Sequence, residues 1–253
     1  MRIIRMALIL SISQIGIVHG QLTGKSFRPC LSTIAEHSIN GLKYSASDRG
    51  NKIILLTAST LVLASLKYDR ATSDYIQKQN PLPPFLAQFG DYYGNYRAGF
   101  GLVTGIGLEA IAGLHSADML FKRLEYASLA MLATAQVTLL LKLVVGRERP
   151  SGKNFRSFPS GHTSHSFAVA TIVNTLYGPI PGIVTYTCAS LVALSRIQDD
   201  AHYLSDVIFG AALGIVIARG FARAYDWDKD ESGKNFHFQL WANNSQIGLT
   251  YKF

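Results

Sequence analysis

The stretch FPSGHTSHSF, residues 158–167, places two histidines three residues apart among small hydroxyl side chains. An apolar segment follows, so PSGH predicts a helix N-terminus, where free backbone amides point at anions. Gly161 would allow an anion to approach the backbone closely, and Ser160 adds a hydroxyl donor. His162 is therefore a candidate for chemistry on an anion; an ordinary capping turn is the alternative. His165 has no partner in the sequence, and we expect it to be structural.

A basic stretch precedes these histidines. KLVVGRERP, residues 142–150, places Lys142 and Arg149 two helical turns apart, so both side chains can point the same way. Pro150 would end the helix and restrict Arg149 to an extended conformation. The pair could bind an anion, or it could be a basic helix end that balances the helix dipole.

A third polar stretch, SRIQDDAHYLSD, covers residues 195–206. His202 and Asp206 are four residues apart, which makes them neighbours if a helix extends across both. The carboxylate could accept the imidazole N–H, fix the tautomer and leave the other ring nitrogen free. Arg196 is the nearby cation. An ordinary surface His–Asp pair would have the same spacing.

Together the three stretches form the ordered pattern K-x6-RP, PSGH and SR-x5-H-x3-D. This pattern resembles the type 2 phosphatidic acid phosphatase and vanadium haloperoxidase superfamily. The resemblance covers residues 142–206, and every motif position is filled: Lys142, Arg149, Pro150, Pro159, Ser160, Gly161, His162, Ser195, Arg196, His202 and Asp206. The linker between the first two motifs, residues 151–158, is short, which suggests a small cap over the site and a substrate different from that of better-known members.

The resemblance implies a phosphatase that works through a phosphohistidine. His202, neutral and aligned by Asp206, would attack phosphorus. His162 would give a proton to the leaving oxygen and then activate water. The expected phosphate-binding residues are Lys142, Arg149, Ser160, Gly161 and Arg196. Because one histidine must be neutral while the other is protonated, we expect a bell-shaped pH dependence of the rate.

The implied mechanism requires no metal and no cofactor, and the cations around the histidines disfavour a divalent ion. Vanadate is expected to inhibit. In the alternative of a vanadate-dependent haloperoxidase, vanadate would be the cofactor, although those members of the family are usually much larger. A phosphotransferase with the same phosphohistidine, and a non-catalytic envelope protein that retains the phosphate site, are the remaining alternatives.

The composition favours a partner that is anionic and partly apolar. The formal net charge is +8, 48% of the residues are hydrophobic and only 16% are charged. We expect the substrate to be a phosphorylated lipid or a small phosphate ester, and an anionic membrane surface to be nearby. Nucleic acid is excluded because the basic residues are scattered and no motif for reading bases is present.

The first residues predict export. Arg2 and Arg5 precede the apolar stretch 6–18, which is typical of a signal peptide over residues 1–20 or of an uncleaved anchor. We therefore expect a protein of the cell envelope that faces the periplasm and is integral to or associated with the membrane. Export would permit a disulfide between Cys30 and Cys188, but the apolar surroundings of Cys188 favour a buried thiol.

Six apolar segments predict an all-α bundle of about six core helices, over residues 52–66, 98–114, 124–145, 166–177, 180–194 and 207–222. We divide the chain into a helical and loop region at 21–97, a phosphatase core at 98–225 and a tail at 226–253. Residues 21–52 are polar and turn-like, and the prolines of NPLPPF, residues 80–85, block a helix. The tail alternates apolar and polar residues around Asn243 and Asn244, which predicts a β-hairpin packed on the bundle.

The sequence leaves membrane spanning open. Most of the apolar segments are shorter than the roughly 20 residues needed to cross the hydrocarbon. Polar residues such as Glu109, Gln136 and Asn174 also interrupt them.

Overall fold

The computed structural model describes residues 27–226, 238–243 and 246–251, and from residue 27 to residue 226 the regular structure is helical. The predicted all-α class is thus confirmed for the bundle. The helices are α2 (Phe27–Ser47), α3 (Arg49–Leu66), α4 (Asp69–Gln79), α5 (Pro84–Tyr92), the π-helical turn η1 (Tyr93–Arg97), α6 (Ala98–Ile111), α7 (Ala117–Val145), α8 (Gly161–Tyr177), α9 (Pro179–Gln198) and α10 (Leu204–Ala224).

All six predicted helices are present, as α3 and α6 to α10, but most begin earlier than predicted. The start of α8 differs in a way that matters for the site. The apolar residues indicate a start near Ser166, whereas the helix begins at Gly161 and Ser160 is its N-cap, accepting a hydrogen bond from the Thr163 amide. The first turn carries polar side chains and therefore gives no apolar signal, although it is helical.

Helix α2 corrects the prediction of a turn-like region over residues 21–52. Its small residues, which suggested turns, instead allow two helices to pack closely. A Cβ added at Gly41 would lie 2.7 Å from the Phe221 ring, and one added at Gly220 would lie 2.1 Å from Ser45 Oγ. Packing against α10 therefore decides the conformation, because tertiary contacts override local propensity.

The prolines of residues 80–85 separate two helices that were not predicted, α4 and α5. Asn80 ends α4 in a left-handed conformation with φ of 46°, and Pro84 is the first residue of α5. Proline is favoured at that position because the amide it lacks would have no partner within the helix. α4 is mostly polar, so the search for apolar segments did not predict it.

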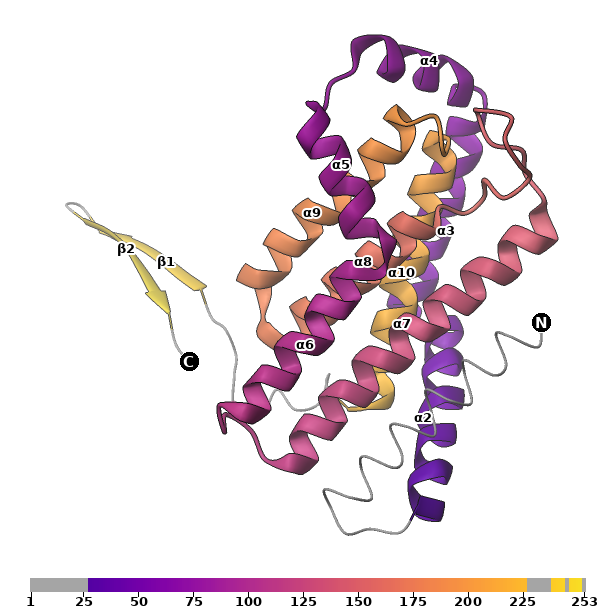
Figure 1. Ribbon diagram of the computed structural model, residues 1–253. Coiled ribbons are helices and arrows are strands. Elements are labelled where there is room, and N and C mark those ends of the chain that lie inside the picture. The colour runs from indigo at the N-terminus through magenta and orange to yellow at the C-terminus, as the bar shows by residue number, and fades with distance from the viewer. Residues whose placement is uncertain (1–26, 227–237, 244–245, 252–253) are drawn as a thin grey trace.

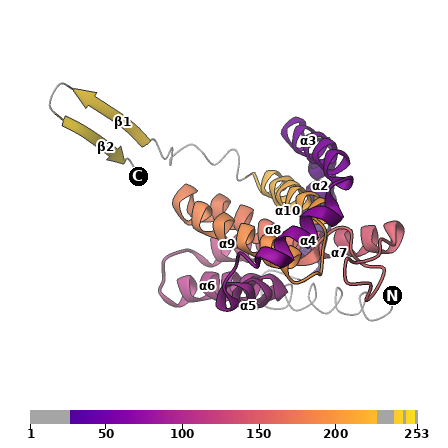
Figure 2. The same cartoon turned by 90° about the horizontal axis from the view of Figure 1, so that it is seen from above.

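The course of the chain places all three motifs at one end of the bundle. Helices α7 to α10 alternate in direction, so the C-terminal ends of α7 and α9 lie beside the N-terminal ends of α8 and α10, in the upper half of Figure 1. The first motif ends α7, the second starts α8, and the third joins α9 to α10. Helix α4 crosses this end of the bundle (Figure 1). In Figure 2, α5 lies on the same side of α4 as α9 does.

Helix α10 packs closely against α8 through its glycines. A Cβ added at Gly210 would lie 2.8 Å from the carbonyl oxygen of Ser160, and one at Gly214 would lie 2.2 Å from that of Ser164. Further along the interface, Leu213 and Ile217 join the hydrophobic core with Ile172. The close approach of the two backbones brings the start of α8 beside the start of α10.

The C-terminal strands pair with each other. Strands β1 (Phe238–Asn243) and β2 (Gln246–Tyr251) are antiparallel, with Phe238 opposite Tyr251. Both views place them apart from the helices (Figures 1 and 2), so a hairpin packed on the bundle, as predicted, is not supported. A lone two-stranded hairpin is marginally stable, because it has no second layer on which to bury an apolar face.

In the part of the chain that the structure describes, three helices are long and apolar enough to cross a membrane: α7 with 29 residues, α9 with 20 and α10 with 21. Each extends beyond the apolar segment predicted for it. On α7 and α9 several large apolar side chains are more than half exposed, namely Leu140, Leu143, Val144, Ile180, Ile183 and Val184. The predicted export signal, residues 1–20, lies outside the described residues.

The contact between α8 and α10 gives a stability prediction. Gly214→Ala places a methyl group against backbone atoms that cannot move aside, so we expect the free energy of unfolding to fall by about 2 kcal/mol. Gly101→Ala in α6 is the matched control, because nothing lies within 4 Å of a Cβ added there. In that exposed helix alanine should stabilise by roughly 0.5–1 kcal/mol. Denaturant unfolding of both variants measures the difference, and equal effects would contradict the close contact.

Candidate active site

The site is organised around the fully buried carboxylate of Asp206, in the first turn of α10. Oδ2 accepts hydrogen bonds from Ser157 Oγ at 2.5 Å and from the Tyr203 amide at 2.9 Å. Oδ1 accepts one from Arg147 Nη1 at 2.7 Å. A buried carboxylate remains ionised when charged and neutral donors surround it in this way. Asp206 thus ties the loop between α7 and α8 to the start of α10.

Arg147 extends this network to α4. Its Nη2 donates to Asp69 Oδ2 at 2.7 Å, its Nη1 also donates to Ser205 Oγ at 2.6 Å, and its guanidinium lies 4.2 Å from the centre of the Tyr203 ring. Asp69 in turn accepts a hydrogen bond from the Ser205 amide at 3.0 Å. Although burial opposes it, the pKa of Arg147 is raised, because two carboxylates flank the guanidinium.

His202 lies in the turn before α10, and only 2% of its surface is exposed. Its Nδ1 is 3.7 Å from Asp206 Oδ2, which is longer than a hydrogen bond. The predicted pairing of His202 and Asp206 is present, but α10 begins after His202, so the two do not share a helix face. Burial lowers the pKa of His202 to about 4 despite the nearby carboxylate. At neutral pH the imidazole is therefore uncharged.

The PSGH stretch is held against this pair. The Ser160 amide donates to the backbone oxygen of Asp206 at 3.0 Å, and Ser160 Oγ accepts from Thr163 Oγ1 at 2.9 Å. At Gly161, an added Cβ would meet only Lys142 Cε at 3.7 Å and Thr138 Cγ2 at 3.8 Å, which are ordinary contacts. Neither protein packing nor a left-handed backbone requires glycine here. Its absent side chain leaves room beside the first amides of α8.

The cations of the first motif lie beside this helix start. Lys142 Nζ donates to the backbone oxygens of Arg156, at 2.6 Å, and Ser157, at 3.4 Å. Arg149 Nε donates to Asn154 Oδ1 at 3.2 Å. Burial lowers the pKa of Arg149, and the charge of Arg196 lowers it further, which indicates that the two guanidinium groups are close. An anion between them would relieve this repulsion.

Arg196 is bound by two carboxylates, which the sequence did not predict. Its Nη1 donates to Asp91 Oδ1 at 2.7 Å and its Nη2 to Asp199 Oδ2 at 2.6 Å. The guanidinium is only 7% exposed, whereas Asp91 and Asp199 are 58% and 40% exposed. The cation of this ion-pair cluster is thus buried, whereas its two carboxylates reach the solvent.

His162 faces Arg196 and Asp91 and is 30% exposed, with Nε2 at 3.5 Å from Asp91 Oδ1. Its pKa is lowered to about 4, mainly by burial and also by the charges of Arg196, His202 and Arg149, while Asp91 opposes the shift. In the absence of an anion both histidines of the motifs are therefore uncharged at neutral pH.

His165 does not join this cluster. It is 4% exposed, its ring nitrogens have no hydrogen-bond partner, and the ring stands edge-on to Tyr96 at 4.9 Å between centres. The expectation that His165 is structural stays a prediction. Among the described residues, no group of three His, Cys, Asp or Glu side chains could hold a metal ion. The Cys188 thiol is free, while the side chain of Cys30 lies outside the described part.

Several site residues were missed from the sequence. Arg147 lies inside the first motif and Ser157 in the linker that follows it, where their proximity to Lys142 and His162 was a usable signal. Asp69 and Asp91 carried none, because they lie on α4 and α5, outside the motifs and far from them in the sequence.

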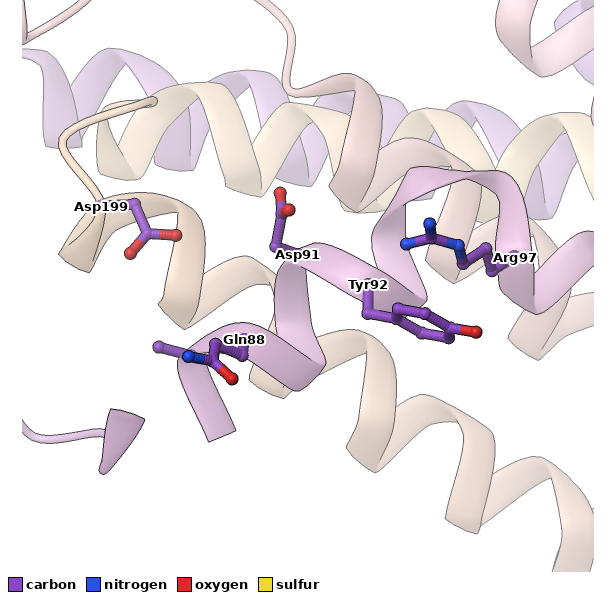
Figure 3. A pocket seen from close by; sticks show the side chains of 6 residues that line it. Gln88, Asp91, Tyr92, Arg97 and Asp199 are labelled. Carbon is purple, nitrogen blue, oxygen red and sulfur yellow. The ribbon is translucent and has the colours of Figure 1, made fainter. Parts of the chain in front are cut away.

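A pocket of about 340 Å³ opens beside Arg196, lined by Ala87, Gln88, Asp91, Tyr92, Arg97 and Asp199 (Figure 3). The Arg97 guanidinium lies over the Tyr92 ring at 3.9 Å.

Comparison with known proteins agrees with the motifs. A model of the PAP2 superfamily matches residues 124–230. A lipid A 1-phosphatase of Porphyromonas gingivalis is 44% identical over 79 residues, 30% of this chain and 18% of that protein. Diacylglycerol pyrophosphate phosphatase 1 of Saccharomyces cerevisiae is 35% identical over 83 residues, 27% of this chain and 29% of that protein. The matches thus span less than a third of either relative.

Among solved structures, the chain is similar to a transmembrane PAP2 type phosphatidylglycerolphosphate phosphatase from Bacillus subtilis. The TM-score is 0.48 at 23% identity, over 73% of this chain and 97% of that chain.

The Arg147 network gives a prediction on stability. Arg147→Met removes the cation from two carboxylates that are at most 3% exposed, so we expect the free energy of unfolding to fall by about 3 kcal/mol. Arg156→Met, at an exposed position in the same loop, should stay within about 0.5 kcal/mol of the parent protein. Denaturant unfolding compares the two. Similar losses would mean that Arg147 does not hold the buried carboxylates.

Proposed function

We propose that this chain, which carries a PAP2 superfamily domain at residues 124–230, is a lipid phosphatase that works through a phosphohistidine. One observation carries the proposal: a buried, uncharged His202 lies against the fixed carboxylate of Asp206, at the end of the bundle where the three motifs meet. A neutral imidazole is a suitable nucleophile for a phosphate ester, because the negative charge of the ester does not repel it.

The surrounding groups suit a phosphate dianion. Lys142, Arg149 and Arg196 supply positive charge, and the Ser160 hydroxyl and the Gly161 amide are neutral donors. Arginine suits two-pronged contact with phosphate oxygens. The open space at Gly161 supports close approach of an oxygen to the start of α8. These contacts would matter most in the transition state, where charge moves onto the oxygens.

In the first proposed step, the free Nε2 of His202 forms a bond to phosphorus as the bond from phosphorus to the leaving oxygen breaks. His162 gives its proton to that oxygen, and the released alcohol or phosphate leaves. Asp206 accepts the Nδ1–H of His202 and stabilises the positive charge that develops on the ring. The contact of 3.7 Å between the two must shorten as this charge develops.

In the second step, the now neutral His162 takes a proton from water. The water oxygen forms a bond to phosphorus, the N–P bond breaks, and inorganic phosphate leaves. His202 is neutral again and His162 is protonated, so the two histidines return to their starting states. The cycle consumes one water and needs no other reactant.

A lipid substrate is supported from two directions. The names of the two curated relatives refer to lipid A and diacylglycerol pyrophosphate. In the described residues of this chain, α7 and α9 expose large apolar side chains, and three helices have the length and composition of membrane spans. We therefore propose a membrane-integral enzyme whose site lies at one end of its spans. Export and an orientation toward the periplasm stay predictions, because they rest on residues 1–20.

The mechanism predicts which substitution abolishes phosphate release. Purified protein should release phosphate from a lipid phosphate, an isoprenoid pyrophosphate or a soluble aryl phosphate in the presence of a chelator, and vanadate should inhibit it. His202→Ala should lower the rate by at least about 10⁴-fold, since the nucleophile is lost. With the ³²P-labelled aryl phosphate, whose leaving group needs no proton, His162→Ala should still form the phosphohistidine and accumulate acid-labile label on His202, because the water step has lost its base. The preferred substrate separates a lipid phosphatase from a soluble phosphatase.

Two results would contradict this mechanism. Retained activity in folded His202→Ala would exclude His202 as the nucleophile. Absence of release from all three substrates by the folded parent protein would favour the haloperoxidase or the binding alternative. Circular dichroism and vanadate binding by the variants serve as controls for folding and for an intact anion site.

Binding of an anion should also take up a proton. The pKa of His162 is about 4 without an anion, and a bound dianion must raise it because opposite charge favours the imidazolium. Between that pKa and the raised value, the complex holds a proton that the free protein lacks, so anion affinity should fall as pH rises through that window. Calorimetry of vanadate binding at pH 7, in buffers of different ionisation enthalpy, measures the uptake. His162→Gln should abolish it; equal uptake by parent and variant would assign the proton elsewhere.

A further inference from the structure

Asp91 is held at the site by two glycines that flank it on α5 and η1. A Cβ added at Gly90 would lie 2.3 Å from Ser195 Oγ on α9, and one added at Gly94 would lie 2.9 Å from His162 Cδ2 on α8. Both positions are too crowded for any side chain. The backbone of α5 therefore packs directly on α9 and that of η1 on α8, the helices that carry the third and second motifs, and Asp91 is fixed one residue after the first glycine.

From this position the Asp91 carboxylate contacts two groups of the proposed reaction. Oδ1 is 2.7 Å from Arg196 Nη1 and 3.5 Å from His162 Nε2. In Figure 3 the carboxylate projects from α5 at the edge of the pocket that also contains Asp199. The same oxygen atom thus lies between the buried cation and the imidazole.

We propose that Asp91 is a positioning residue for His162: its carboxylate accepts the Nε2–H of the protonated ring and holds the imidazolium in place for proton transfer. The inference rests on the phosphatase function proposed above. An imidazolium carries a proton on both nitrogens, so Nε2 can remain bound to Asp91 while Nδ1 gives its proton to the leaving oxygen. His162 would then have a carboxylate partner, as His202 has Asp206.

The charges around His162 explain why such a partner is needed. Arg196 from α9, Arg149 from the loop after α7 and His202 from the turn before α10 all disfavour a positive charge on the ring. Burial acts in the same direction, and Asp91 is the group that opposes them. Without this carboxylate, only the substrate would be left to draw a proton onto His162, and the ring would lose it at a lower pH.

Asp199 provides a matched control. It binds the other amino group of Arg196, with Nη2 to Oδ2 at 2.6 Å, so it neutralises that guanidinium as Asp91 does. It is not among the groups that chiefly shift the pKa of His162. Substitution of either aspartate frees one side of Arg196, but only substitution of Asp91 removes the partner of the imidazole.

The test is the pH dependence of kcat for the full-length parent protein, Asp91→Asn, Asp199→Asn and Asp91→Glu, with the preferred substrate in detergent micelles. The high-pH limb of kcat reports loss of the proton from the acid in the substrate complex. For Asp91→Asn we expect this limb to move about one unit to lower pH, with a fall in kcat at pH 7.5 of about tenfold. Asp199→Asn should leave the limb in place, even if KM changes. Asp91→Glu should return it toward the parent value.

A second measurement does not depend on activity. NMR of protein labelled with ¹⁵N at histidine, in each of the four forms without substrate, should give a lower pKa for His162 in Asp91→Asn than in the parent and in Asp199→Asn. Failure of the proposed function, such as activity in His202→Ala, is therefore distinguishable from failure of this inference.

Three outcomes would overturn the inference. Equal shifts of the high-pH limb in both asparagine variants would mean that Asp91 acts through Arg196 alone. A rise in kcat/KM in Asp91→Asn without a shift of the limb would mean that Asp91 obstructs the phosphate site. An unchanged His162 pKa in Asp91→Asn would exclude the contact with the imidazole in solution.

Discussion

The buried carboxylate of Asp206 is the interaction on which the arrangement of the site depends. Through Ser157 and Arg147 it fixes the loop after α7, and through the Tyr203 amide it ends the turn before α10. Its own backbone oxygen receives the Ser160 amide and so fixes the start of α8. One residue therefore connects the three motifs, and removal of its charge would leave Arg147 with one carboxylate partner, Asp69, instead of two. A buried charge with so many partners stabilises one geometry and disfavours others.

These polar contacts are possible only because the helices approach one another closely. Glycines at 210 and 214 bring α10 onto the backbone of α8, and glycines at 90 and 94 bring α5 onto α9 and η1 onto α8. Larger residues at these places would separate the helix ends and lengthen the hydrogen bonds to Asp206 and Arg196. The apolar core lower in the bundle, with Ile172 and Phe221, then holds the helices in this register.

Much of the bundle could be predicted from the sequence, because apolar runs announce helices that bury a face. The polar α4, the proline-started α5 and the small-residue helix α2 could not, since tertiary packing rather than local preference forms them. The motif residues were found as a group because their spacing is specific, and the alternation of α7 to α10 brings their segments together. The two carboxylates that bind Arg196 could not be predicted from the sequence. Asp91 lies on a helix that is distant in the sequence, and Asp199 lies in the third motif but meets Arg196 only because of the conformation at the end of α9.

The charge of the site explains why two histidines suit the proposed reaction. A carboxylate nucleophile would be repelled by a phosphate dianion, and an imidazolium has no free electron pair. A neutral imidazole avoids both problems, and burial keeps His202 in that form. The acid needs the opposite state, yet it lies beside the same cations. Its more exposed position and the carboxylate at the rim make protonation of His162 sensitive to an arriving anion, so the site would acquire its acid only when there is a phosphate to act on.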